Sequence, residues 1–239
     1  MWDYCTPEKD RAALLTISAQ RDFTAVGSPV RACGLERAVP AMGRLAKAFR
    51  DQGAPIFHSV RLYRPDGSNV DACRRQSVEE GLRILMPGTF GVELLDELKP
   101  DPDLRLEPEL LLSGAFQRIG AQEQVFYRPR WGAFHGTGLE QALCAAEIST
   151  LVICGFSFAT GARATVYEAS ARDFRIVVVP DAICGASEEG LCELARMGVH
   201  LMDSDCCRSW LAHRAAGGAS AVAHEALSSD LPELPQLAM

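Results

Sequence analysis

Short apolar runs alternate with amphipathic segments along most of the chain, and this alternation predicts its secondary structure. The apolar runs are predicted as six β-strands, at residues 12–18, 54–60, 124–128, 149–157, 175–182 and 199–204. The segments with apolar residues at helical spacing are predicted as helices, at residues 34–52, 139–147, 164–174 and 187–198. Because strands and helices alternate, we expect an α/β fold. The expected architecture is a single-domain three-layer sandwich on a six-stranded, mainly parallel, Rossmann-like sheet.

One long segment interrupts this alternation. Residues 61–120 are irregular and rich in Pro, Gly, Asp and Arg, and excursions of this length in compact domains usually cover a ligand. Residues 215–239 are rich in Ala, Gly, Ser and Pro and are predicted as a flexible tail. We therefore expect one domain over residues 1–214, with a pocket-covering excursion at 61–120.

Composition excludes several classes of protein. The 239 residues are 48% hydrophobic, and 24 Lys and Arg against 31 Asp and Glu give a net charge of −7. This acidic balance argues against nucleic-acid and anionic-membrane partners. No apolar run is long enough to span a bilayer, and the N-terminus lacks a signal-peptide pattern. We expect a cytoplasmic protein.

The nine cysteines form no recognisable pattern. They include no CxxC pair, and no two His residues have the spacing of metal ligands, so no metal and no cofactor is expected. Most of the thiols are predicted to be small buried apolar groups. Cys154 lies inside an apolar run and is predicted to be buried and inert.

In a parallel sheet, ligands bind beyond the carboxyl ends of the strands. The polar and glycine-rich positions at those ends are Ser18, Gln20, His58, Arg61, Arg128, Arg130 and residues 156–161. We expect these positions to share one rim of the sheet.

Four segments together resemble a known family. They are ALLTISAQRDF (13–23), MPGTFGVELLDELKP (86–100), VFYRPRWGAFHGTGLEQAL (125–143) and LVICGFSFATGARATVYEASARDFRIVVVPDA (151–182). In this order and spacing they are similar to motifs of the isochorismatase-like cysteine hydrolases. The resemblance implies a six-stranded parallel sheet between helices, a small-molecule ligand, and assembly as a homodimer or homotetramer.

The resemblance also implies a catalytic set that this chain lacks. In the amidases of the family an Asp takes the proton of a Cys thiol, the thiolate attacks a carbonyl carbon, and a Lys stabilises the charges. Ser18, Arg128 and Gly161 stand at these Asp, Lys and Cys positions. Isochorismatases share the Gly but keep the Asp. Where nicotinamidases carry an Asp-x-His-x-x-His metal site, this chain has His58 followed by Ser, Val and Arg.

Several residues remain as candidates for the site. The catalytic candidates are His58, Arg128 and Ser18. The substrate-binding candidates are Gln20, Phe23, Arg61, Tyr63, Trp131, Phe134, Phe156, Ser157, Phe158 and Gly161. Each has a structural alternative: a hydrogen-bonded core histidine for His58, a solvated loop for Arg61 and Tyr63, and core packing for the aromatic residues.

Two functions stay open at this stage. The first is a hydrolase-family enzyme with altered chemistry that acts on a small anionic or cyclic metabolite. Secondary metabolism is one setting for such an enzyme. The alternative is an inactive family member, a pseudoenzyme that serves as a binding or partner protein. Loss of the three catalytic side chains favours the second, whereas basic residues at the strand ends favour the first.

Overall fold

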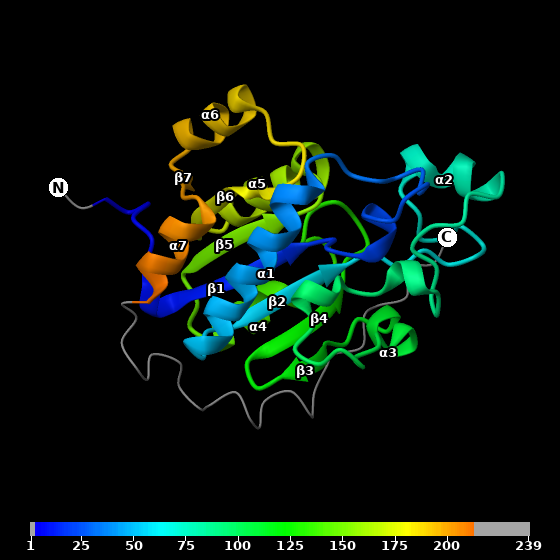
Figure 1. The fold of residues 1–239 in the computed structure, drawn as a ribbon, viewed down its shortest axis with the longest axis horizontal. Helices are drawn as coiled ribbons and strands as arrows, with labels where there is room; N and C mark the ends of the chain where they lie inside the picture. The colour runs from blue at the N-terminus through cyan, green and yellow to red at the C-terminus, as the bar shows by residue number, and fades with distance from the viewer. Residues whose placement is uncertain (1–2, 213–239) are drawn as a thin grey trace, which may run out of the picture.

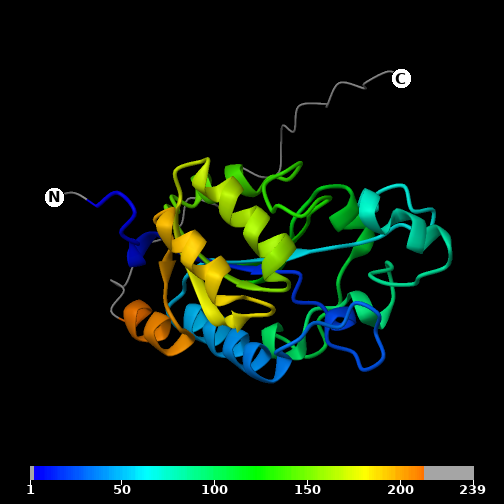
Figure 2. The ribbon, with the colours of Figure 1, turned by 90° about the horizontal axis from the view of Figure 1, so that it is seen from above.

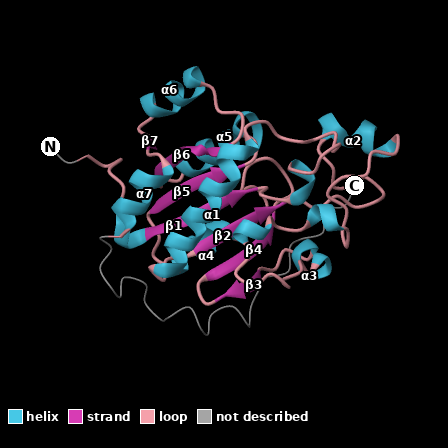
Figure 3. Ribbon diagram, viewed as in Figure 1, coloured by secondary structure: helices cyan, strands magenta, loops and turns pink. Residues whose placement is uncertain are grey.

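The computed structural model of the protein describes residues 3–212. Its strands form one sheet in the order β3-β4-β2-β1-β5-β6-β7 (Figures 1 and 3). The strand bounds are β1 Ala12–Ile17, β2 Ile56–Val60, β3 Gln117–Gly120, β4 Glu123–Tyr127, β5 Thr150–Gly155, β6 Arg175–Ile183 and β7 His200–Leu201. All neighbours pair in parallel except β3 and β4, which are antiparallel.

Helices cover both faces of this sheet, which confirms the predicted three-layer α/β architecture. The helix bounds are α1 Leu35–Asp51, α2 Ala72–Glu79, α3 Pro108–Leu112, α4 Leu139–Ala145, α5 Arg163–Ser170, α6 Glu188–Arg196 and α7 Ser204–Leu211. Seen from above, α1 and α7 lie on one face, and α4 and α5 lie on the other (Figure 2). Ser187 caps α6, since its Oγ accepts the N–H of Gly190 at 3.1 Å.

The sheet has seven strands among the described residues, and the expected number of six was therefore one too low. The additional strand, β3, lies inside the 61–120 excursion and pairs with β4 at the edge of the sheet. Only Gln117 of its four residues is buried. A short polar edge strand has no apolar run, so periodicity gives no signal for it.

The end of the last predicted strand was also wrong. The pattern at 199–204 predicts a strand, but β7 covers only His200–Leu201 and Ser204 already begins α7. The carboxylate of Asp203 accepts the N–H of Cys206 at 2.7 Å and caps this helix. An Asp cap directly after a strand ends the extended backbone at that point.

The excursion at 61–120 is folded onto the sheet. It contains α2, α3 and β3. A second apolar cluster joins it to β2 and β4, through Val60, Leu62, Val92, Leu94, Leu106, Leu111 and Val125. The main core lies around β1 and β5, whose residues are all buried, as expected for parallel strands covered on both faces.

Nothing in the described part of the chain tests the predicted tail, because residues 215–239 lie outside it. Over residues 3–212, no helix combines the length and apolar character needed to cross a membrane. The sheet order places β4, β2, β1 and β5 side by side, so the residues after these four strands meet at one rim.

Candidate functional site

The hydroxyl of Ser18 and the guanidinium of Arg128 are in direct contact at that rim. Ser18 follows β1 with a positive φ of 49°, and Arg128 follows β4. Arg128 Nη2 donates to Ser18 Oγ at 2.5 Å. Both residues are buried, with 2% and 3% of their surface exposed. The structure thus brings together two of the three predicted catalytic candidates.

Arg128 is held mainly by neutral acceptors. Its Nη1 donates to the carbonyl oxygens of Arg130 at 2.7 Å and Trp131 at 2.5 Å. No carboxylate of residues 3–212 forms an ion pair with it. Burial, reinforced by the nearby charge of Arg61, lowers the pKa of the Arg128 guanidinium to about 9. Its surroundings therefore disfavour an uncompensated positive charge.

Gly161 completes this group. It lies in the π-helical turn Phe158–Ala162 that precedes α5. A Cβ atom on Gly161 would lie 2.8 Å from Arg128 Nη2 and 2.8 Å from Ile17 Cγ2. Arg128 therefore fills the space that a side chain at position 161 needs, and this site contains neither a thiol nor a carboxylate.

Backbone amides on either side of Gly161 form hydrogen bonds within the turn. The peptide between Phe156 and Ser157 is cis. The N–H groups of Thr160 and Ala162 donate to the Ser157 carbonyl at 3.3 Å and 3.2 Å. These two amides are therefore paired within the turn.

A second polar group adjoins Arg128. Arg61 Nη2 and the Tyr63 hydroxyl both donate to Asp71 Oδ2, at 2.6 Å and 2.9 Å. Arg74 Nη1 donates to the Tyr63 hydroxyl at 3.1 Å. We refer to Arg61, Tyr63, Asp71, Arg74 and Arg128 as the arginine cluster.

Sequence analysis placed Arg61 and Tyr63 at the site but missed Asp71 and Arg74. Asp71 is the residue before α2, and its carbonyl accepts the N–H groups of Arg74 and Arg75 at 2.8 Å and 2.9 Å. An Asp before a helix is a typical N-terminal residue, so Asp71 was an unused local signal for α2 in a segment that was expected to be irregular. Nothing in that signal tells that its carboxylate faces Arg61.

Gln20 binds backbone at this rim. Its Nε2 donates to the carbonyls of Arg61 at 2.9 Å and Val92 at 2.7 Å, and its Oε1 accepts the Arg61 N–H at 2.8 Å. The side chain is fully buried. Gln20 thus links the start of the excursion to the end of β1, and these backbone hydrogen bonds occupy its side-chain amide.

The structure pairs His58 with residues other than Ser18 and Arg128. His58 Nδ1 hydrogen-bonds Thr16 Oγ1 at 2.8 Å, and Nε2 hydrogen-bonds Glu123 Oε1 at 2.7 Å. Glu123 begins β4, whereas Arg128 follows its other end. With no exposed surface and both ring nitrogens paired, His58 matches the alternative of a hydrogen-bonded core histidine.

Glu123 is the acceptor at the centre of this network. Burial acts to raise its pKa, but hydrogen bonds from Arg50 and His58 outweigh burial and hold the pKa below its usual value. Arg50 donates from Nε to Glu123 Oε2 at 2.7 Å and from Nη2 to Oε1 at 2.6 Å. This network joins α1 to β2 and β4.

The aromatic candidates do not form one wall. Phe23 and Phe156 are buried and pack with ring centroids 6.1 Å apart. Phe134 is buried against Phe174 at 5.6 Å. These contacts agree with the core-packing alternative.

The remaining candidates differ in exposure. Phe158 is 3% exposed and lies under the guanidinium of Arg163, with 4.9 Å from its ring centroid to Cζ. Ser157 is half-buried. Trp131 is 40% exposed, so among the aromatic candidates it presents the most surface to solvent.

The expectation that most thiols are buried was wrong. Cys154, Cys184 and Cys207 are buried, but the other six are exposed, namely Cys5, Cys33, Cys73, Cys144, Cys192 and Cys206. Short loops and the outer sides of helices place these six at the surface. Cys154 is fully buried, as predicted, and burial raises the pKa of its thiol, which disfavours the reactive thiolate.

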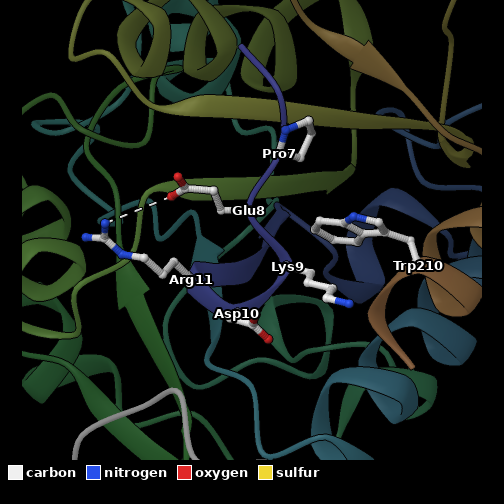
Figure 4. Close-up of a pocket in the computed structure, with 6 residues that line it drawn as sticks. All are labelled: Pro7, Glu8, Lys9, Asp10, Arg11 and Trp210. Carbon is white, nitrogen blue, oxygen red and sulfur yellow. Dashed lines mark ion pairs between the residues drawn. The ribbon is translucent and has the colours of Figure 1, made fainter. Parts of the chain in front are cut away.

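Two described cavities lie away from the arginine cluster. One, of about 640 Å³, is lined by Pro7, Glu8, Lys9, Asp10, Arg11 and Trp210 (Figure 4). The second lies between α1 and α7. No three His, Cys, Asp or Glu side chains of the described residues are grouped as a metal site would require.

Comparisons with known proteins agree with the sequence motifs. The isochorismatase domain profile matches residues 12–107 and 112–206. A probable inactive nicotinamidase of Arabidopsis thaliana is 27% identical over 179 residues, covering 74% of this chain and 82% of that protein. An N-carbamoylsarcosine amidase of an Arthrobacter species is 26% identical over 181 residues, covering 73% of this chain and 60% of that protein. The crystal structure of an isochorismatase family protein from Desulfovibrio vulgaris has a TM-score of 0.72 and 27% identity, covering 85% of this chain and 99% of that one.

Proposed function

Because this chain belongs to the isochorismatase family, we propose that it is a member without thiol-dependent hydrolysis. It serves as a binding or partner protein, and its ligand is a small molecule. One observation carries the proposal. The Arg128 guanidinium hydrogen-bonds Ser18 and fills the space beside Gly161, where the family motif has its nucleophile. The likeness to a probable inactive nicotinamidase supports the same interpretation.

The chemistry of these three residues explains the proposal. A serine hydroxyl is not a carboxylate base, and glycine offers no atom that attacks a carbonyl. The guanidinium of Arg128 presents a planar fork of donors, which suits binding an anion better than transferring a proton. Cys154 offers no replacement, because its thiol is buried and kept protonated.

A direct assay tests the proposal. The purified full chain is incubated with nicotinamide, N-carbamoylsarcosine and ureidoacrylate, and released ammonia is measured. We expect no release above that of buffer alone. Turnover that disappears when a thiol reagent modifies one cysteine would overturn the proposal and identify the missing nucleophile.

An enzyme of altered chemistry, acting on a small anionic or cyclic metabolite, is the second candidate. The specific observation in its favour is the buried positive charge of Arg128 at the lysine position of the family motif. Incubation of the protein with cell extract, followed by mass spectrometry, separates the two. A retained but unchanged metabolite supports binding, whereas a metabolite consumed by wild type and not by Arg128→Ala supports catalysis.

A further inference from the structure

Two buried arginines of the arginine cluster follow paired positions of neighbouring strands. Val60 pairs with Tyr127 in the parallel register of β2 and β4, and Arg61 and Arg128 come next on the two strands. The Arg128 N–H donates to the Val60 carbonyl at 3.0 Å, which keeps the two segments side by side. After burial, the charge of Arg61 is the next cause that lowers the pKa of Arg128, so the two guanidinium groups affect each other.

The charges in this cluster are not balanced. Asp71 pairs with Arg61, but Arg128 has no carboxylate partner among residues 3–212. The fully buried members thus have two positive charges against one negative charge, and half-buried Arg74 adds a third positive charge at the side. Excess charge away from water is unfavourable unless an ion of the opposite sign compensates it.

Several hydrogen-bond donors in the cluster have no acceptor among the described residues. Nε and Nη1 of Arg61 and Nε of Arg128 are buried, and the described residues provide them with no acceptor. Arg61 and Arg128 are 2% and 3% exposed. Buried guanidinium N–H groups normally have acceptors. Other arginines of the described residues have at most one such nitrogen, whereas Arg61 has two, so Arg61 is the member of the cluster with most capacity for a further acceptor.

We propose that the arginine cluster binds the carboxylate group of a small organic acid, held jointly by Arg61 and Arg128. This inference rests on the proposed function, since it names the class of ligand that the site binds in place of an amide substrate. A carboxylate is planar and matches the fork of a guanidinium group. Its single negative charge equals the excess charge of the buried members, whereas a phosphate dianion exceeds it.

Asp71 shows that the cluster binds a carboxylate of the chain itself. One of its oxygens already takes the hydrogen bonds of Arg61 and Tyr63. Its negative charge also opposes a second anion nearby. Asp71 therefore sets the affinity of the site, and Asp71→Asn, which keeps an oxygen acceptor but removes the charge, is expected to strengthen carboxylate binding.

Calorimetric titration of the full chain in chloride-free buffer tests the inference. Acetate is the smallest carboxylate probe, acetamide is its neutral counterpart, and inorganic phosphate is the alternative oxyanion. We expect acetate to bind with millimolar affinity, acetamide not to bind, and phosphate to bind more weakly than acetate. Arg61→Gln and Arg128→Gln should each weaken acetate binding at least about tenfold, the effect of losing one charged hydrogen-bonding partner.

Two further variants keep the test decisive. Arg118→Gln removes an exposed guanidinium on β3 and should leave acetate binding unchanged. Asp71→Asn should tighten it, a gain that a purely structural role of the cluster does not produce. The inference is overturned if acetate binds neither wild type nor Asp71→Asn, if phosphate binds and acetate does not, or if folded Arg128→Gln binds acetate as wild type does. Such a result leaves the proposed function standing, because the ammonia assay tests hydrolysis separately.

Discussion

Arg128 donates a hydrogen bond to Ser18 across 2.5 Å, between residues 110 positions apart in the chain. Both stand where the family motifs have catalytic side chains, and here they bind each other. These two side chains contain neither a carboxylate nor a thiol. The hydrogen bond holds the Arg128 guanidinium beside Ser18.

The first prediction concerns the space beside Gly161. Gly161→Ala should lower the free energy of unfolding by about 1–3 kcal/mol, because the new methyl group overlaps the Arg128 guanidinium and Ile17. Chemical denaturation measures the change. In the background of Arg128→Ala the same substitution should cost less, since one of the two clashing groups is gone. Equal costs in both backgrounds would contradict the packing described for Arg128.

The second prediction concerns the acceptor of Arg128. Ser18→Ala should destabilise the protein by about 1–3 kcal/mol, because it leaves a buried, charged N–H without its acceptor. Ser18→Asn should recover much of this loss, since Asn offers an oxygen and tolerates the positive φ at this position. Thermal melting compares the three proteins. An alanine variant as stable as wild type would mean that the hydrogen bond contributes nothing.

The third prediction is a pH dependence. The pKa of Glu123 is lower in the folded chain than its usual value of 4.5. Its ionised form therefore stabilises the fold above that pH, and this contribution is lost as the pH falls through the lowered folded value. Glu123→Gln should be less stable than wild type at neutral pH, and the difference should shrink in acid.

A matched variant controls for the loss of charge alone. Glu189→Gln removes an exposed carboxylate of α6 and should differ little from wild type at any pH. If the stability gap of Glu123→Gln were constant from neutral to acid pH, the pairing of Glu123 with Arg50 and His58 would not have the effect assigned to it.

The fourth prediction concerns thiol reactivity. Burial raises the pKa of Cys184 and of Cys207 to about 12, and Cys154 is fully buried. Iodoacetamide should therefore label the six exposed cysteines of the native protein and spare these three, as read by peptide mass spectrometry. All nine should react in denaturant. Rapid native labelling of Cys154 would reopen the possibility of a thiol nucleophile.

The sequence was sufficient for the layered architecture and for the grouping of Ser18, Arg128 and Gly161. Apolar runs alternating with helical patterns predicted the layered α/β fold, because parallel strands must be covered on both faces. The motifs placed Ser18, Arg128 and Gly161 together at the strand ends, and the structure has them in contact. What periodicity could not predict was the polar edge strand β3, since its pairing with β4 comes from tertiary contact.

Only the tertiary structure decided what each polar side chain at the sheet does. From the sequence, both His58 and Arg128 were catalytic candidates at the rim. In the structure His58 hydrogen-bonds Glu123, and Arg128 hydrogen-bonds Ser18. Asp71 is ten residues from Arg61, and in the sequence it looks like no more than a residue that begins a helix. In the structure its carboxylate pairs with Arg61, one of the two buried arginines. The physical reason is that hydrogen bonds and ion pairs depend on which groups meet in space, whereas hydrophobic periodicity is already present in the order of the residues.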